Sequence, residues 1–184
     1  MLQLKERLAD GYKGKRVTVE RHQVTNASGK EFAYEIGVVK NAVAVLPVQE
    51  INGDPHYVLL KNDRYPVGGH MIEVCAGLID DGEQIMAAAA RELKEETGYI
   101  ASTYKPLGMY FTSPGWTTER IYAFYCEGLT IGEQQLEEAE EGLEVIVVHR
   151  GQAIEWVKNN TIKDAKTAIM IMQHACIDLN WSKD

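Results

Sequence analysis

The stretch from Gly77 to Ile100, GLIDDGEQIMAAAARELKEETGYI, constrains this chain more than any other part of its sequence. Alanine has the highest helix propensity, and the run Ala87 to Ala90 lies at the centre of the stretch. Acidic residues favour a helix N-terminus, and glycine favours the left-handed residue that ends a helix. The residues placed to mark these two ends are Asp80, Asp81 and Glu83 before the alanines, and Gly98 after them. The pattern therefore predicts a helix.

Three glutamates, Glu92, Glu95 and Glu96, lie within roughly a 100° arc of that helix. Like charges one turn apart destabilise a helix, and Arg91, four residues before Glu95, is placed to offset part of this repulsion. Runs of charge usually form a solvated face. Carboxylates are, however, the ligands that Mg2+ takes together with substrate phosphates. The spacing alone leaves both interpretations open.

Composition narrows the classes of partner. The formal net charge of -8 makes a nucleic-acid backbone an unexpected main partner, because phosphate backbones are bound by clustered Lys and Arg. Cys75, Cys126 and Cys176 show no CxxC spacing and are expected to be buried, reduced residues. The N-terminus lacks an apolar signal segment, and no apolar run is long enough to span a bilayer. We therefore expect a soluble cytoplasmic protein with no membrane partner.

Strand patterns lie on both sides of the helix. Phe32, Tyr34 and Ile36 alternate with less apolar residues, so residues 15–39 are expected to form a hairpin around the turn residues 26–29. Further strands are expected at residues 41–50, 55–63, 71–77, 105–112, 119–128 and 143–149, and helices near residues 152–159 and from Ala165 to Leu179. On the helix of the opening stretch, the expected apolar stripe is Met86, Ala89 and Ala90, below Leu93. This order predicts an α/β (α+β) fold, a mixed sheet covered by helices on both faces.

The spacing of the opening stretch resembles the complete Nudix box, GX5EX7REUXEEXGU. Gly77 and Glu83 occupy its first fixed positions, and the run Arg91 to Gly98 supplies the rest. Tyr99 departs mildly from the aliphatic residue usual at the last position. The resemblance covers about residues 40–184 and implies the Nudix fold for them, with residues 1–39 as an N-terminal β extension. It also implies hydrolysis of a nucleoside diphosphate linked to another group.

The resemblance also implies roles for residues of the box. Glu92, Glu95 and Glu96 would bind Mg2+, or Mn2+ in its place, with help from the backbone carbonyl of Ala76, and Glu92 and Glu96 would count as catalytic. Gly77, Glu83, Arg91 and Gly98 would shape the box, with Arg91 orienting Glu95 and Glu83 bracing the loop or reaching an outer metal.

Features outside the box resemble the ADP-ribose and nucleoside-diphosphate-sugar pyrophosphatases of that family. Glu73 begins a segment like this branch's E-x-PAG, except that Cys75 replaces the usual proline, as in GDP-mannose hydrolases. Pro114 and Glu119 lie in a loop near the position that marks ADP-ribose hydrolases. In this branch, the N-terminal hairpin builds an intertwined dimer. The implied substrate is a nucleoside diphosphate sugar, and a homodimer is expected.

Two further site residues follow from the same resemblance. Arg64 lies where the branch has an arginine that reaches substrate phosphate; the alternative is a surface arginine beside Asp63. The branch also has a catalytic glutamate before its last strand. Counting back from Leu143, Glu141 matches best, with Glu140 and Glu138 as rivals, and most glutamates of that loop are expected to be solvated.

Other side chains and other functions are weaker candidates. Tyr65, Phe111 and Trp116 could stack on a base, although aromatic residues in such positions are more often core, and no histidine shows paired ligand spacing. A nucleoside triphosphate or capped-RNA pyrophosphohydrolase is the alternative enzyme. A non-catalytic metabolite sensor ranks below both, since such proteins usually lose carboxylates of the box.

Overall fold

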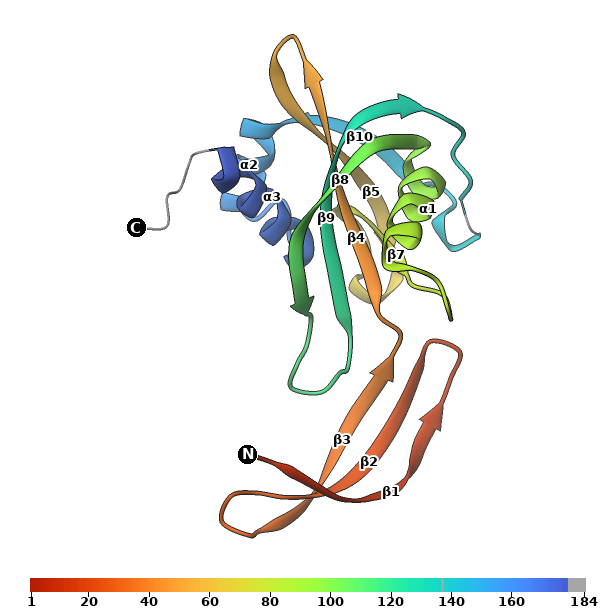
Figure 1. Cartoon of the computed structure of the whole chain (residues 1–184), viewed down its shortest axis with the longest axis vertical. Helices are drawn as coiled ribbons and strands as arrows, with labels where there is room; N and C mark the ends of the chain where they lie inside the picture. Colours follow the sequence, from red (N-terminus) through yellow and green to blue (C-terminus); the bar gives the residue numbers. More distant parts are fainter. Residues whose placement is uncertain (137, 179–184) are drawn as a thin grey trace. The chain divides into compact units, whose positions relative to one another are not determined.

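The computed structural model describes residues 1–136 and 138–178 of the chain (Figure 1). The strands are β1 Gln3–Lys13, β2 Val17–Thr25, β3 Glu31–Val39, β4 Ala42–Ile51, β5 Asp54–Arg64, β6 Gly69–Glu73, β7 Cys75–Leu78, β8 Tyr99–Phe111, β9 Arg120–Ile131 and β10 Glu144–His149. The α-helices are α1 Ile85–Thr97, α2 Arg150–Lys158 and α3 Ala165–Asp178, and two 3-10 turns lie at η1 Tyr65–Val67 and η2 Glu138–Glu140. The end expected for the last helix, Leu179, lies outside the described residues.

The main sheet has seven strands and is built around β4. Its order is β10-β5-β4-β9-β8, with β6 beside β5 and β7 beside β4. Val43, Ala44, Val45 and Leu46 of β4 are all completely buried, as expected for a central strand covered on both faces. In Figure 1, α1 lies on one side of this sheet, and α2 and α3 lie on the other. The predicted mixed sheet with helices on both faces is confirmed.

The helix of the opening stretch is confirmed, but its buried side agrees with the predicted stripe only at Ala89, with Leu93 above it. Its apolar contacts with the core are made by Ala88, Ala89 and Leu93, whereas Met86 and Ala90 are exposed. Gly98 ends the helix in the left-handed conformation, with φ of 73°, and its N–H bonds the carbonyl of Lys94. The acidic residues at positions 80, 81 and 83 all precede the first turn, which contains no acidic residue.

The N-terminal residues form a separate antiparallel sheet in the order β1-β2-β3. The predicted hairpin is present as β2 and β3, with Gly29 at φ of 81° in the turn. The third strand, β1, was not predicted. Its pairing with β2 is broken by register shifts at Leu4/Glu6, Arg7/Ala9 and Asp10/Tyr12. A bulge adds a residue to one strand, so β1 cannot show the strict alternation by which a strand is recognised.

The chain divides into two compact units, one formed by Met1–Ala42 with Tyr110–Ile121 and the other by Val43–Met109 with Tyr122–Asp184. Within the first unit, the β8–β9 loop joins β3. The N–H of Gly37 donates to the carbonyl of Trp116 at 2.6 Å, and the Tyr34 hydroxyl donates to the carbonyl of Gly115 at 2.6 Å. The role of residues 1–39 in dimerisation stays a prediction.

Three aromatic residues expected mainly in the core are exposed. Tyr65 is 95% exposed, Trp116 58% and Phe111 49%. All three lie in turns or at the end of a strand, where an aromatic side chain has few neighbours to cover it. The cysteines behave more nearly as expected, since Cys75 and Cys126 are buried and Cys176 is partly so, and all three are free thiols. Within the described residues, no helix is both long and apolar enough to cross a membrane.

Candidate active site

The box carboxylates are placed by the packing of α1 on β7. Alanines at positions 88 and 89 let the helix approach the strand closely, so the carboxylates on the same side of α1 are carried inward. Glu92 is 7% exposed and Glu96 is 2% exposed. Glu96 Oε2 accepts the N–H of Ala76 at 2.8 Å, which fixes one carboxylate to the strand backbone. The predicted role of the Ala76 carbonyl as a metal ligand stays a prediction.

Gly77 provides the space in which the Glu92 carboxylate lies. A Cβ atom built on Gly77 would stand 2.1 Å from the carboxyl carbon of Glu92, far inside van der Waals contact. The glycine that opens the box is therefore required by the glutamate fifteen residues later, through a contact between β7 and α1. This contact gives the fixed spacing between the two residues a physical reason.

Gly77→Ala is expected to reduce hydrolysis more than stability. The new methyl group must displace a carboxylate at the end of a side chain that can rotate, so the fold can adapt while the site geometry is lost. We expect turnover to fall at least about tenfold. Steady-state kinetics and thermal unfolding measure the two effects. Gly11→Ala, whose Cβ would make ordinary contacts at 3.5 Å, is the control. Equal activity of both variants would contradict this role for Gly77.

Arg91 donates hydrogen bonds to four residues around the site. Its Nη1 donates to Glu92 Oε1 at 2.7 Å and to Glu95 Oε2 at 2.9 Å, so the pair expected from the i,i+4 spacing is present. Its Nε and Nη2 donate to the two oxygens of Glu83 at 2.9 Å each, and Nη2 also donates to the carbonyl of Leu78. These hydrogen bonds lower the pKa of Glu83 to about 2. Glu83 thus contacts both Arg91 and the N–H of Asp80, and its role in bracing the loop before α1 stays a prediction.

Burial disfavours the ionised form of the two buried carboxylates, Glu92 and Glu96. It raises the pKa of Glu92 to about 6, in spite of Arg91, and the pKa of Glu96 to about 8. A buried carboxylate with too little opposite charge favours protonation or the binding of a cation. Within residues 1–136 and 138–178, no three acidic, His or Cys side chains stand together as a formed metal site. The donor set of buried carboxylate oxygens nevertheless fits a hard divalent cation such as Mg2+.

Arg64 lies beside this cluster and is held by Glu73. Arg64 Nε and Nη2 donate to the two oxygens of Glu73 at 2.8 Å each, and Lys166 Nζ donates to Glu73 Oε2 at 2.9 Å. Burial opposes the ionisation of Glu73, but these cations outweigh it and keep its pKa below the ordinary value. The hydrogen bonds of Glu73 are the main cause that raises the pKa of Arg64, and the negative charge of Glu96 also contributes. The guanidinium is therefore fixed within electrostatic reach of a box carboxylate.

Lys166 was missed in the sequence because its partner is far away along the chain. It lies in the first turn of α3 and is separated from Glu73 by 93 residues, and it also pairs with Asp164 at 3.0 Å. Asp164 in turn accepts the N–H of Thr167 at 3.0 Å, and the Thr167 hydroxyl accepts the N–H of Val74 at 2.8 Å. Asp164 followed by Thr167 is a capping pattern that marks the helix start. It gives no sign that the helix start reaches the β6–β7 junction.

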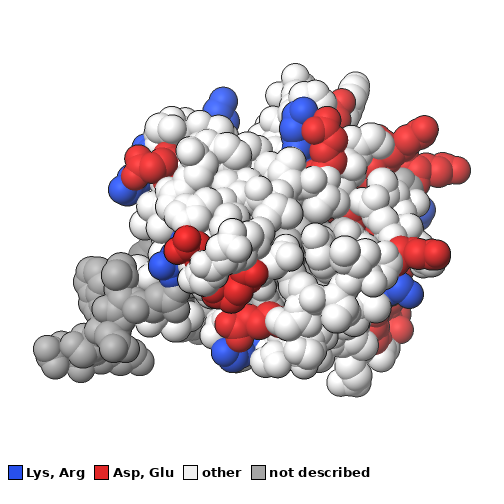
Figure 2. All heavy atoms as spheres, turned by 90° about the horizontal axis from the view of Figure 1, so that it is seen from above, with Lys and Arg blue, Asp and Glu red and all other residues white. Residues whose placement is uncertain are grey.

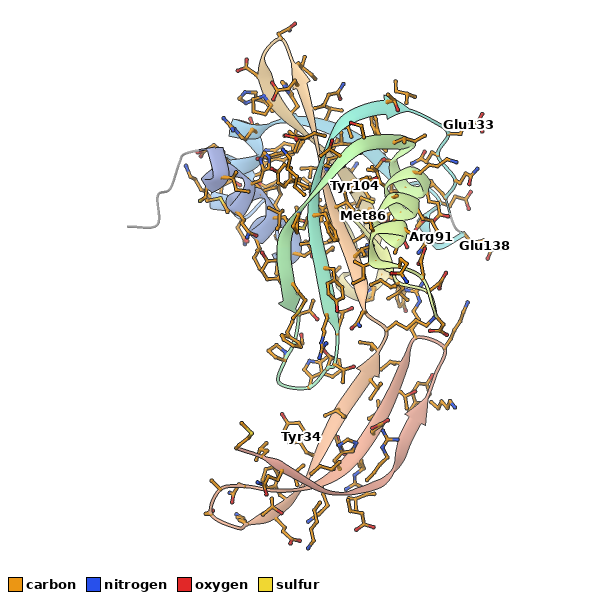
Figure 3. The ribbon with its side chains drawn as sticks, viewed as in Figure 1. Tyr34, Met86, Arg91, Tyr104, Glu133 and Glu138 are labelled. Carbon is orange, nitrogen blue, oxygen red and sulfur yellow. The ribbon has the colours of Figure 1, made fainter. Side chains whose placement is uncertain are left out.

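The residues between β9 and β10, residues 132–143, are here called the acidic segment. Seen from above in Figure 2, Asp and Glu side chains gather along the right-hand edge, where α1 and this segment lie in Figure 1. Glu133 and Glu138 point away from α1 (Figure 3), and Glu141 is exposed. Glu140 is partly buried, and its charge helps to raise the pKa of both Glu92 and Glu96, after burial. As a candidate for the catalytic glutamate before the last strand, Glu140 is therefore better supported than Glu141. The catalytic role predicted for Glu141 stays a prediction.

The remaining predicted substrate residues lie in the other compact unit. Pro114 is in the β8–β9 loop, and Glu119 directly precedes β9 and accepts a hydrogen bond from the Thr112 hydroxyl. Both lie in the segment that joins β3. Their contribution to substrate binding stays a prediction, as do the exposed aromatic residues of the same loop.

Known proteins resemble this chain in sequence and in fold. Residues 38–169 match the family described as NUDIX domain. An ADP-ribose pyrophosphatase of Bacillus subtilis is 33% identical over 161 residues, which cover 87% of this chain and 85% of that protein. A GDP-mannose pyrophosphatase of Cronobacter sakazakii is 38% identical over 109 residues, 58% of this chain and 56% of that protein. A crystal structure of an ADP compounds hydrolase has a TM-score of 0.81 and covers 99% of both chains at 20% identity, which shows the same fold.

The chain belongs to the Nudix hydrolase family, as the fold, the box and the family match together show. It is a hydrolase that acts on pyrophosphate bonds, and its family generally uses a divalent metal ion. Among its relatives are pyrophosphatases of ADP-ribose and of GDP-mannose.

Proposed function

We propose that this chain hydrolyses the diphosphate bond of nucleoside diphosphate sugars in the presence of Mg2+, with ADP-ribose as the first candidate and GDP-mannose as the second. Addition of water across the P–O–P bridge gives a nucleoside monophosphate and a sugar phosphate. The observation that carries the proposal is the pair of buried carboxylates, Glu92 and Glu96, held against β7 with Arg64 in electrostatic reach. The names of two relatives support the substrate class.

The carboxylates of Glu92, Glu95 and Glu96 would hold Mg2+, with Mn2+ as a substitute. When bound, the cation neutralises charge on phosphoryl oxygens and lowers the pKa of a bound water. The carboxylates of Glu92 and Glu96 are buried, whereas that of Glu95 is partly exposed, so the site is open toward solvent on the side of Glu95. Arg91 is placed to keep Glu92 and Glu95 in position while substrate binds and leaves.

Arg64 is the proposed ligand for a substrate phosphate. Glu73 engages its Nε and Nη2, which fixes the plane of the guanidinium, and the side chain of Arg64 remains 40% exposed. Arg64 is thus pre-oriented at low entropic cost to bind an anion. In this proposal Glu73 acts on substrate through Arg64, with Lys166 as the second cation that keeps Glu73 ionised.

Glu140 is the proposed acceptor of the proton that the attacking water loses. Glu140→Gln is expected to reduce kcat by about 100-fold, since a general base contributes about 100-fold or more. The KM for the diphosphate should change little, because the amide keeps the volume of the side chain. Glu141→Gln and the exposed Glu133→Gln should retain most of the activity. Steady-state kinetics on all three variants, purified in parallel, measures the difference. A large loss in Glu141→Gln and none in Glu140→Gln would reverse the assignment.

A substrate panel tests the proposed function. ADP-ribose, ADP-glucose, GDP-mannose, UDP-glucose, NADH and nucleoside triphosphates are incubated with the protein and Mg2+, and with a chelator as control. We expect sugar phosphate release from at least one nucleoside diphosphate sugar. Pyrophosphate release from triphosphates alone would support the alternative enzyme. Tight binding of a nucleotide sugar without turnover would favour the metabolite sensor.

A further inference from the structure

The carboxyl end of α1 is capped by a distant part of the chain. The last carbonyls of a helix have no partner within it and must be satisfied from outside. Here the carbonyl of Glu95 accepts the N–H of Gln135 at 2.9 Å, and the carbonyl of Gly98 accepts the N–H of Gly132 at 2.6 Å. The carbonyl of Glu96 accepts a side-chain donor, the Nε2 amide of Gln134, at 2.6 Å.

These three bonds join the start of the acidic segment to the helix turn that carries the box carboxylates. The fit is close, since a Cβ atom on Gly98 would lie 3.2 Å from the backbone N of Gln134. Farther along, Leu136 packs against the hydrophobic core, and Leu143, at the other end of the segment, is buried in that core. The N–H of Leu143 also donates to the carbonyl of Glu140 at 2.9 Å. The segment that carries Glu140 is thus attached to the core at both of its ends.

We propose that Gln134 is a positioning residue, which holds the acidic segment against the last turn of α1 so that Glu140 faces Glu92 and Glu96. Its amide donates to the backbone carbonyl of Glu96 itself, so the segment that leads to Glu140 starts on the helix turn that carries a box carboxylate. The amide of Gln134 makes the only one of the three bonds that depends on a side chain, and so the only one that a substitution can remove cleanly. This inference rests on the proposed function of the site. It adds Gln134 as a residue that takes no part in the hydrolysis itself and acts only by positioning Glu140.

Gln134→Met tests the inference, because methionine has a similar length and no donor. Gln135→Met is the matched control: Gln135 is the adjacent glutamine, it is also exposed, and it contributes its backbone N–H to the same cap. We expect kcat of Gln134→Met to fall about fivefold, which corresponds to about 1 kcal/mol, with KM and Tm close to those of Gln135→Met. In a Glu140→Gln background, the same substitution should cause no further loss, since the group that it positions is already gone.

Amide hydrogen exchange supplies a readout that does not require activity. In the metal-free protein, the N–H of Gly132 should exchange faster in Gln134→Met than in Gln135→Met, and the N–H of Gln135 should exchange faster in Gln134→Met than in the wild type. Unchanged amide exchange overturns the inference, whether or not the protein hydrolyses a diphosphate. A protein that hydrolyses no diphosphate but shows the faster exchange would contradict the proposed function alone. Equal kcat in the two variants also overturns it, as does a fivefold loss that persists in the Glu140→Gln background.

Discussion

Glu96→Gln is expected to reduce the turnover of any diphosphate substrate by about 1000-fold while leaving the fold intact. The amide has the same volume and can still accept the N–H of Ala76 through its oxygen. It has no negative charge, and an amide is a weak ligand for Mg2+ compared with a carboxylate. A cation that stabilises developing charge contributes several kcal/mol, and each 1.36 kcal/mol corresponds to a factor of ten in rate. Glu96 is the most deeply buried carboxylate of the box, so water cannot easily replace it.

The decisive comparison is between Glu96→Gln and Glu133→Gln, assayed with saturating Mg2+ on the best substrate of the panel. Glu133 is an exposed glutamate of the acidic segment and carries the same substitution, so it controls for the loss of one charge. Far-UV circular dichroism and thermal unfolding establish that both variants are folded. Near-normal turnover in Glu96→Gln would show that the buried carboxylates of α1 do not bind the catalytic cation.

The box could be predicted from the sequence because its chemistry is concentrated in one helix and the strand before it. Helical spacing alone places Glu92 and Glu96 on one side, and the pairing of Arg91 with Glu95 also follows from it. Which side of the helix is buried could not be predicted in the same way. The helix has exposed alanines as well as buried ones, so propensity gives no preference between Ala89, which is buried, and Ala90, which is not.

The surroundings of the box depend on contacts that no local pattern records. Lys166 reaches Glu73 across 93 residues, and Gln134 reaches the backbone of Glu96 across 38. Glu140 and Glu141 are adjacent in an irregular segment, where no period distinguishes a side chain that faces the site from one that faces solvent. In these places tertiary packing determines the arrangement, and the sequence supplies only the residue types.

The free energy of unfolding of the metal-free protein is expected to fall as the pH rises from about 4.5 to about 8. Burial raises the pKa of Glu96 from 4.5 to about 8 in the folded chain. Between these values the folded state holds a proton that the unfolded state has lost, so stability decreases with pH. Its contribution is fully present below pH 4.5 and is lost above about pH 8. The loss from Glu96 is at most about 5 kcal/mol, and Glu92, with a pKa of about 6, adds a smaller loss.

Urea unfolding in the presence of a chelator, at about pH 5 and about pH 8, measures this loss. Glu96→Gln has no charge to bury, so its stability should fall much less over the same interval, and at pH 8 the metal-free variant should be more stable than the wild type. Glu133→Gln should follow the wild type. Millimolar Mg2+ should restore the stability of the wild type at pH 8, because it binds the ionised carboxylates. It should leave the stability of Glu96→Gln nearly unchanged. If the metal-free wild type is as stable at pH 8 as at pH 5, the folded chain itself stabilises the ionised carboxylate of Glu96. The buried negative charge would then be balanced without a cation, and it could not serve as an argument for metal binding.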